Sequence, residues 1–287
     1  MPFTLPWNML LFHALTAHAV PDACDGYGDL GWGGSAAEGD VRYDGTSRYD
    51  QVGHSLAQLA DFDGDGQTDL AFGAPGDAVG GPRAGRVDLM LSDHRYLSVR
   101  DVVTLEGPSD YARVGWTVRS AGDLDADGRT DLVISGRGGT GGASDGGRAW
   151  VISGRPNMPA VWRLADGADA ELAGLEPGDD FGTAMAALGD VNGDGVGDLA
   201  FGAPGAGGVG AVYVFYGPVV GLVSPADADQ VWWGEEVGDR AGASLAAVDV
   251  DLDGVAELVV GAPRNDGAIE AFGAAYVVRV AERTAGG

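Results

Sequence analysis

The sequence predicts an all-β fold built from four consecutive repeats of about 60 residues, and three observations support this prediction. An Asp-rich segment of one pattern recurs four times, beginning at residues 61, 123, 190 and 249, with spacings of 62, 67 and 59 residues. Short apolar runs of strand length flank each copy. The chain also contains 51 glycines among 287 residues, as expected if every repeat contains several tight turns.

The first copy, DFDGDGQTDLAFGAP at residues 61–75, places oxygen-bearing side chains at positions 1, 3, 5 and 9, which are Asp61, Asp63, Asp65 and Asp69. Calcium takes six to eight oxygen ligands in a flexible shell, and alternating carboxylates on a tight loop supply them. Gly66 at position 6 suits a turn that needs positive φ. A single copy is also compatible with a solvated acidic turn, so the metal hypothesis depends on the repetition.

The other three copies keep this pattern. Their residues at positions 1, 3, 5 and 9 are Asp123, Asp125, Asp127 and Asp131, then Asp190, Asn192, Asp194 and Asp198, and finally Asp249, Asp251, Asp253 and Glu257. Position 6 is Gly in every copy. Position 7 varies through Gln67, Arg129, Val196 and Val255, as expected of a residue that binds metal through its backbone carbonyl. The repetition predicts four Ca²⁺ sites that use these twenty residues.

These loops differ from an EF-hand, which ends with a bidentate Glu at position 12 between two helices. Position 12 here is Phe72, Ile134, Phe201 or Val260, position 13 is Gly73, Ser135, Gly202 or Gly261, and a short apolar strand follows position 9. One strand precedes each loop, a second follows it, and a third and a fourth complete the repeat. Four-stranded units in series predict a β-propeller with one blade per repeat.

The combined motif resembles the FG-GAP repeat of integrin α-subunit propellers. It consists of Phe181-Gly182 before a calcium loop and Gly-Ala-Pro after it, at residues 73–75, 202–204 and 261–263, and the resemblance covers roughly residues 39–280. The second copy departs from it with Ser135-Gly136-Arg137, and three copies have Val52, Val114 or Ala241 in place of the Phe. The resemblance implies that calcium is held between the first and second strands of a blade.

The fourth repeat has no predicted fourth strand, whereas residues 39–45, GDVRYDG, lie at the fourth-strand distance ahead of Gly53. We therefore expect this N-terminal strand to complete the last blade and close a four-bladed ring, which would leave no exposed sheet edge. The best-known members of the resembling family have seven blades. The alternative is therefore an array completed by a partner chain.

The N-terminus predicts an extracellular or cell-surface protein. Residues 1–19 contain an apolar run ending in Ala17-His18-Ala19, as expected of a secretory signal peptide, although no basic residue precedes the run. Residues 20–38 form a tail with a degenerate half-repeat, residues 24–34, that is expected to hold no metal. Residues 39–287 are assigned to the propeller. The only cysteine, Cys24, excludes an internal disulfide, and no apolar segment is long enough to span a membrane.

A net charge of −26 argues against partners that carry many phosphates, such as nucleic acids and anionic membranes. No nucleophile and base arrangement appears in the motifs, and His54 and His94 are better explained as structural, so we expect a non-enzymatic binding module. A protein or a glycan is the expected ligand; a carbohydrate-binding propeller and an accessory domain of a secreted hydrolase are the alternatives. Candidate contact residues are Trp32, Trp116, Trp150, Trp162, Trp232 and Trp233, and packing between blades is the simpler explanation of each. Because adjacent strand residues face opposite ways, one of Trp232 and Trp233 is expected to be exposed or to lie at a blade interface.

Overall fold

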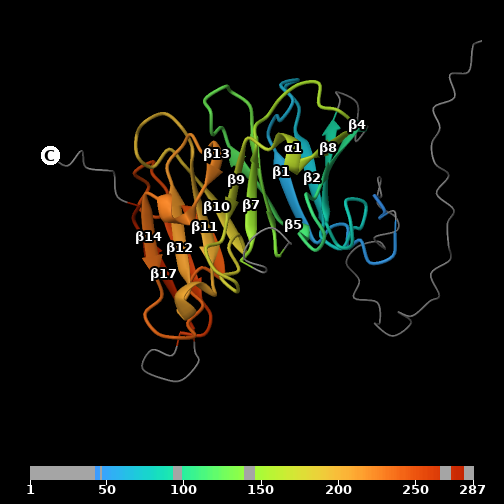
Figure 1. Ribbon diagram of the computed structural model, residues 1–287. Helices are drawn as coiled ribbons and strands as arrows, with labels where there is room; N and C mark the ends of the chain where they lie inside the picture. The colour runs from blue at the N-terminus through green and yellow to red at the C-terminus, as the bar shows by residue number, and fades with distance from the viewer. Residues whose placement is uncertain (1–42, 46, 93–98, 139–145, 266–272, 281–287) are drawn as a thin grey trace, which may run out of the picture. The chain divides into compact units, whose positions relative to one another are not determined.

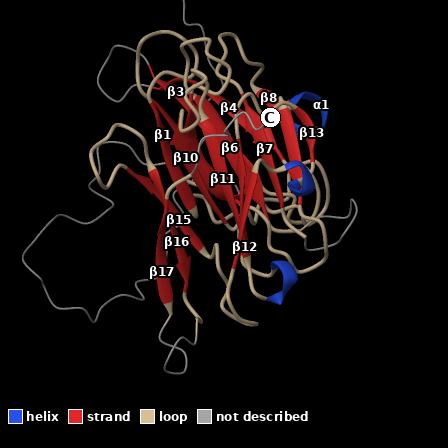
Figure 2. Cartoon of the chain, turned by 90° about the vertical axis from the view of Figure 1, so that its left-hand side faces the viewer, coloured by secondary structure: helices blue, strands red, loops and turns tan. Residues whose placement is uncertain are grey.

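A computed structural model describes residues 43–280 except 46, 93–98, 139–145 and 266–272. The expected signal peptide and the tail with its half-repeat lie outside the described residues, as do Cys24, Trp32 and His94. The described chain consists mainly of strands, with one helical turn, α1 (Leu164–Gly167), and two short 3₁₀ turns, Ala206–Gly208 and Pro225–Asp227. Figure 2 shows how little of the described chain is helical.

Four sheets follow one another along the chain, one for each predicted repeat (Figure 1). The first contains β1 (Ser55–Leu59), β2 (Asp69–Ala74), β3 (Arg86–Ser92) and β4 (Val99–Glu106). The second contains β5 (Val114–Gly122), β6 (Asp131–Gly136), β7 (Arg148–Ile152) and β9 (Ala170–Ala173). The third contains β10 (Ala184–Gly189), β11 (Asp198–Ala203), β12 (Ala211–Phe215) and β14 (Gln230–Trp233). The fourth contains β15 (Ser244–Val248), β16 (Glu257–Ala262) and β17 (Ala274–Val278).

The predicted all-β fold of repeated, mainly four-stranded sheets is confirmed. Within each sheet the strands named above are antiparallel to their neighbours and follow chain order. The predicted ring closure is not observed. In the described residues the fourth sheet has three strands, and residues 43–45, the described part of the expected closing strand, are not in a strand.

Two short strands that the sequence did not predict tie neighbouring sheets together. The connection between β7 and β9 contains β8 (Val161–Arg163), which pairs in parallel with β4 of the first sheet. The connection between β12 and β14 likewise contains β13 (Gly221–Val223), which pairs in parallel with β9 of the second sheet. The connections within the second and third repeats therefore each donate a fifth strand to the edge of the sheet before.

The apolar core lies between consecutive sheets. A cluster between the first and second sheets includes Leu59, Leu89, Val118 and Ile134, all fully buried. Equivalent clusters join the second sheet to the third and the third to the fourth. Because each inner sheet buries both faces, its strands are apolar at successive positions instead of alternating. Strand β11 shows this, since all six of its residues are buried.

The glycine that begins the Gly-Ala-Pro motif in the first and third repeats allows consecutive sheets to approach closely. A Cβ atom on Gly73 would lie 2.2 Å from the carbonyl oxygen of Gly115, and one on Gly202 would lie 2.0 Å from that of Gly242. Neither distance is sterically possible, so a side chain at these positions would push the sheets apart. The second repeat has Ser135 here; it is buried, and its hydroxyl accepts a hydrogen bond of 3.2 Å from the N–H of Thr117.

A buried ion cluster in the first sheet joins Arg86 to Asp77 and Asp88. All three side chains are at most 4% exposed. The Arg86 guanidinium donates to Asp77, and its Nε donates to Asp88 over 2.8 Å; the Thr104 hydroxyl also donates to Asp88, over 2.9 Å. Asp77 accepts a further bond of 2.7 Å from the N–H of Val79. Removal of the guanidinium would therefore leave two buried carboxylates without their counter-charge.

We predict that Arg86→Ala lowers the free energy of unfolding by about 3–5 kcal/mol, the range typical when one partner of a buried ion pair is deleted. Urea unfolding measures this change. Arg163→Ala is the matched control, because Arg163 is 71% exposed and its nearest contact with Glu106 is 3.4 Å. The control should change stability by less than about 1 kcal/mol, and equal effects of the two substitutions would contradict the prediction.

Candidate calcium-binding loops

The four Asp-rich segments form the loops between the first and second strands of each sheet. Because the sheets follow one another in the same orientation, neighbouring loops meet. The N–H of Thr130 in the second loop donates to the carbonyl of Asp61 in the first, over 2.8 Å. The N–H of Gly197 in the third loop donates to the carbonyl of Asp123 in the second, over 3.2 Å. The first three loops are therefore connected through their backbones.

Position 1 closes every loop in the same way. The carboxylate accepts a hydrogen bond from the N–H of the position-6 glycine, at 2.9, 2.8, 2.8 and 2.9 Å in the four copies in order. That glycine has a φ of 82°, 85°, 89° or 92°, a left-handed conformation that costs other residues energy. The predicted need for glycine at position 6 is confirmed in all four loops.

Positions 3 and 5 orient each other along the loop. The side-chain oxygen at position 5 accepts from the N–H of position 7, over 2.8–2.9 Å in every copy. The side-chain oxygen at position 3 accepts from the N–H of position 5, over 2.9–3.2 Å. These turns hold the side chains in the same arrangement in all four copies of the motif, as a repeated ion site would require.

Position 9 anchors the loop to the sheet. Asp69, Asp131 and Asp198 are fully buried. One oxygen of each carboxylate accepts from the N–H of position 2, over 2.9, 2.6 and 2.8 Å. The other oxygen accepts from the N–H of Ser92, Gly154 or Gly217, just after or at the end of the third strand, over 2.8–2.9 Å. The short side chain thus fixes the loop against two strands.

Burial raises the pKa of Asp69, Asp131 and Asp198 above the ordinary value for Asp, and in the case of Asp131 to about 6. The two backbone hydrogen bonds to each carboxylate oppose this shift, and the nearby acidic residues of the same loop add to it. A cation bound beside these groups would favour their charged form. Burial therefore disfavours the charged form of these position-9 carboxylates, whereas a bound cation would favour it.

The structure brings three acidic oxygens within 4.8 Å of one another in three of the loops. The groups are Asp61, Asp63 and Asp69; Asp123, Asp125 and Asp127; and Asp249, Asp251 and Glu257. In the third loop Asn192 replaces one acid, and its amide donates to Asp194 over 2.9 Å. A donor set made only of oxygens, with spare acceptor capacity, fits a hard cation such as Ca²⁺. The assignment of individual ligands stays a prediction.

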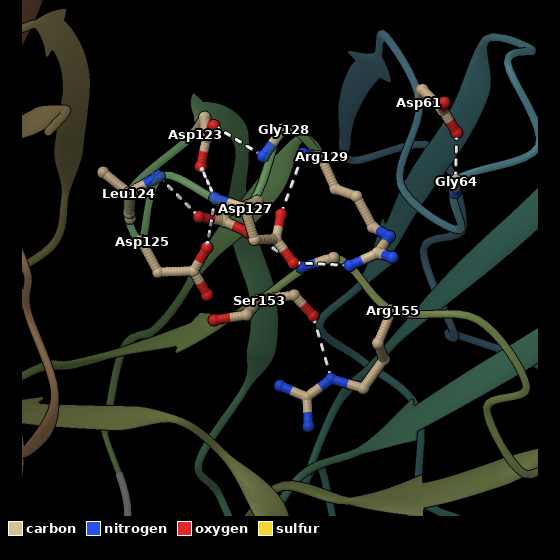
Figure 3. A network of polar contacts seen from close by, with 12 residues as sticks. Asp61, Gly64, Asp123, Leu124, Asp125, Asp127, Gly128, Arg129, Ser153 and Arg155 are labelled. Atoms are coloured by element: carbon tan, nitrogen blue, oxygen red, sulfur yellow. Dashed lines mark hydrogen bonds and ion pairs between the residues drawn. The ribbon is translucent and has the colours of Figure 1, made fainter. Parts of the chain in front are cut away.

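The second loop contains an internal cation, shown in Figure 3. Arg129 Nη1 lies 2.5 Å from the Asp127 carboxylate. The same side chain extends toward the first loop, because a Cβ on Gly64 would lie 2.8 Å from Arg129 Nε. The varied residue types at position 7 indicated a role through its backbone carbonyl only, so this side-chain contact was not predicted.

The fourth loop contains a cation from outside the motif. Arg279 follows β17, and its Nη2 contacts Asp251 and lies 3.3 Å from Asp253 and 3.2 Å from Glu257. These carboxylates raise the pKa of Arg279, with Asp251 contributing most. The residues at the same strand position in the other repeats, judged by the pairing register, are Leu91, Ser153 and Tyr216. No spacing rule within the loop motif could have identified this contact.

Of the aromatic residues proposed as ligand contacts, Trp150 is fully buried in the core, whereas Trp233 is 55% exposed. Trp232 packs against the cluster between the third and fourth sheets. The expectation that one of these two adjacent tryptophans is exposed or lies at a blade interface is confirmed. Trp116 is half-buried and lines a hollow of about 220 Å³ together with Tyr49, Arg83 and Arg113.

This hollow lies where the Gly-Ala-Pro segment of the first repeat meets the start of β5, at the opposite end of the strands from the loops. Among the helices of the described residues, none is long and apolar enough to cross a membrane.

Comparisons with known proteins agree with the repeat pattern. A sequence model of the FG-GAP repeat matches residues 52–90, 181–215 and 241–278, which lie in the first, third and fourth repeats. The second repeat, with its Ser135-Gly136-Arg137 departure, is not among the matched segments.

Three similar proteins illustrate the extent of the likeness. Phosphatidylinositol-glycan-specific phospholipase D of Homo sapiens is 38% identical over 164 residues, covering 53% of this chain and 19% of the relative. Integrin alpha-V of Gallus gallus is 32% identical over 240 residues, covering 80% of this chain and 22% of the relative. Integrin alpha-PS2 of Drosophila melanogaster is 32% identical over 228 residues, covering 75% and 15%. The chain thus spans only about a fifth of the length of these curated relatives.

We predict that Gly66→Ala weakens the first loop. No atom lies within 4 Å of the added Cβ, so the cost comes only from a φ of 82° and is about 1–2 kcal/mol. Thermal unfolding in calcium measures it. Gly66→Asn is the control, because Asn tolerates this conformation better and should lose less stability. An equal loss for both variants would show that the conformation of Gly66 is not what matters.

We also predict that Arg279→Ala strengthens calcium binding at the fourth loop, because the guanidinium contacts the same carboxylates that a metal would use. Calorimetric titration of the chelator-treated protein should show one site binding more tightly. Arg264→Ala removes an equal charge from an exposed position away from the loop and serves as the control. If both variants bind calcium alike, Arg279 acts only through net charge.

Proposed function

Because the chain contains three FG-GAP repeats and is homologous to the repeat regions of integrin α subunits, we propose that it is a calcium-stabilised, non-enzymatic binding module that acts outside the cell or at its surface. The observation that carries this proposal is the shared loop geometry. In each of the four loops the position-1 carboxylate accepts a hydrogen bond from the N–H of a position-6 glycine in a left-handed conformation. An acidic turn without a ligand has no reason to be built the same way four times.

Calcium would act structurally in this proposal. The side chains at positions 1, 3, 5 and 9 and the carbonyl at position 7 would hold the ion, and the ion would offset the repulsion among the acidic groups of each loop. Binding to the folded state alone would then raise its stability by mass action. Position 9 would transmit this effect, because its carboxylate also bonds the backbone next to the third strand.

The ligand of the module is proposed to be a protein, as the similarity to integrin α subunits favours. Its contact site is proposed to be the hollow lined by Tyr49, Arg83, Arg113 and Trp116. No ion pair involves either arginine in the described part of the chain, although the protein carries 43 acidic residues against 17 basic ones. Unpaired guanidinium groups beside two aromatic rings suit a carboxylate-bearing ligand.

A carbohydrate-binding module is the second candidate, favoured by the exposed ring of Trp233. The phospholipase relative supports a third, an accessory domain that works beside a catalytic one, because the likeness covers only 19% of that enzyme. Two experiments separate the carbohydrate candidate from the protein candidate. A glycan array compares the wild type with Trp233→Ala, and a pull-down compares the wild type with Arg113→Ala.

We predict that titration calorimetry of the chelator-stripped chain shows about four calcium ions bound, one per loop. Asp125→Ala should remove one ion and lower the melting temperature more in calcium than without it, because the lost oxygen would be a metal ligand in addition to accepting the N–H of Asp127. Asp166→Ala, a substitution in α1 outside the four loop segments, is the control and should bind like the wild type. A stoichiometry near zero would refute calcium binding, and unchanged melting of Asp125→Ala would remove the second loop from the proposal.

A further inference from the structure

The sheets pack on one another through two kinds of face. We call the face toward the following sheet the trailing face and the face toward the preceding sheet the leading face. Between the first and second sheets, Leu59 and Leu89 on the trailing face pack against Val118 and Ile134 on the leading face. The same two faces meet in the next two interfaces. The chain therefore builds one type of contact three times.

The two end sheets carry these faces without a partner among the described residues. The leading face of the first sheet exposes Leu56 by 58% and Leu70 by 43%. In the second sheet the equivalent residues by strand register, Val118 and Leu132, are fully buried. The same position holds leucine in all four repeats: Leu70, Leu132, Leu199 and Leu258. An apolar residue thus stays at an exposed position where its three counterparts are core.

The trailing face of the fourth sheet shows the complementary exposure. Val277 is 59% exposed and Val248 is 43% exposed. Their counterparts in the first sheet, Leu89 and Leu59, are fully buried. Ala246 and Ala275 on this face are exposed as well. The strand positions named on both end faces carry no charge, although the protein has a net charge of −26.

The two end faces do not cover each other within the chain. The first strands connect the sheets in sequence, because β1 contacts β5, β5 contacts β10, and β10 contacts β15. No comparable contact joins β1 to β15 in the part of the chain that the structure describes. In Figure 1 the first sheet lies at the right, whereas β17 of the fourth sheet lies at the left, where it overlaps strands of the third.

Tyr43 gives independent evidence that the leading face of the first sheet accepts a preceding sheet. The fourth strand of each of the first three sheets contains an apolar residue two positions before a glycine, and this residue packs against the next sheet. These residues are Leu105, Leu172 and Trp232. Tyr43 lies two residues before Gly45, and its ring stacks on Phe72 of β2 with centroids 5.6 Å apart. It therefore takes the place that a preceding sheet's fourth strand fills elsewhere.

We propose that a second copy of this chain covers these faces, with the trailing face of the fourth sheet of one copy packed on the leading face of the first sheet of the other. The contact would repeat the interface already formed three times inside each copy. It is head-to-tail, so each copy uses two different surfaces, and two such contacts would close a ring of two copies. This inference does not depend on calcium binding or on the identity of the ligand.

The test is the oligomeric state of the purified chain in calcium and physiological salt, measured by sedimentation velocity over a range of concentrations. The wild type should reach twice the chain mass. Leu56→Asp on the leading face and Val277→Asp on the trailing face should each weaken association by about tenfold or more, because both place a charge in an apolar contact. Leu222→Asp, at a residue 88% exposed on β13, is the control and should associate like the wild type.

A mixture of the two variants tests whether the two end faces contact each other. Leu56→Asp keeps an intact trailing face and Val277→Asp keeps an intact leading face, so an equimolar mixture should regain a one-to-one dimer with a single contact. Both positions are exposed, and circular dichroism should show that each variant is folded. A wild type that stays monomeric, a control that dissociates like the others, or a mixture that stays monomeric would overturn the proposal. The first result would mean that the end faces are covered within one chain or left open.

Discussion

Repulsion among clustered carboxylates is the constraint on which the rest of this structure depends. Four acidic or amide side chains within nine residues are unfavourable in any chain that does not offset their charge. The backbone offsets part of it, since each position-1 carboxylate accepts from a glycine N–H and each position-9 Asp accepts from two backbone N–H groups. This requirement fixes the loop conformation, and the loop in turn fixes the register of the first two strands. The shared pairing of the first two strands in all four sheets therefore follows from this local chemistry.

The sequence predicted those features that local chemistry determines. The loop positions, the left-handed glycines and the three or four strands of each sheet follow from side-chain oxygens, backbone sterics and apolar runs. The exposure of one of the adjacent residues Trp232 and Trp233 followed from strand alternation. The sequence did not predict β8 and β13, because three-residue strands carry no detectable period and depend on a partner edge far along the chain.

The same limit explains the candidate site. Arg279 reaches the fourth loop only because β17 ends beside it, which is a consequence of sheet register and not of motif spacing. Arg129 could be seen in its motif, but its carbonyl role concealed the side-chain contact with Asp127. A count of predicted strands showed that the fourth repeat lacks a fourth strand. It could not show which segment, if any, pairs at that edge, so ring closure could not be settled from the sequence. Contacts made by tertiary structure were the ones that sequence reasoning missed.

The loops are not equivalent, although their motif is. The first three are linked by backbone hydrogen bonds from Thr130 to Asp61 and from Gly197 to Asp123, so an ion held in one of them would brace its neighbour. In the fourth, Arg279 from outside the motif contacts three carboxylates, and the longer Glu257 stands at position 9. Both differences reduce the benefit of binding metal there. Among the described residues the fourth sheet also has three strands instead of four, and its trailing face is uncovered. It is therefore the least constrained by its own loop. A contact from outside the sheet would therefore add most stability at this end of the chain.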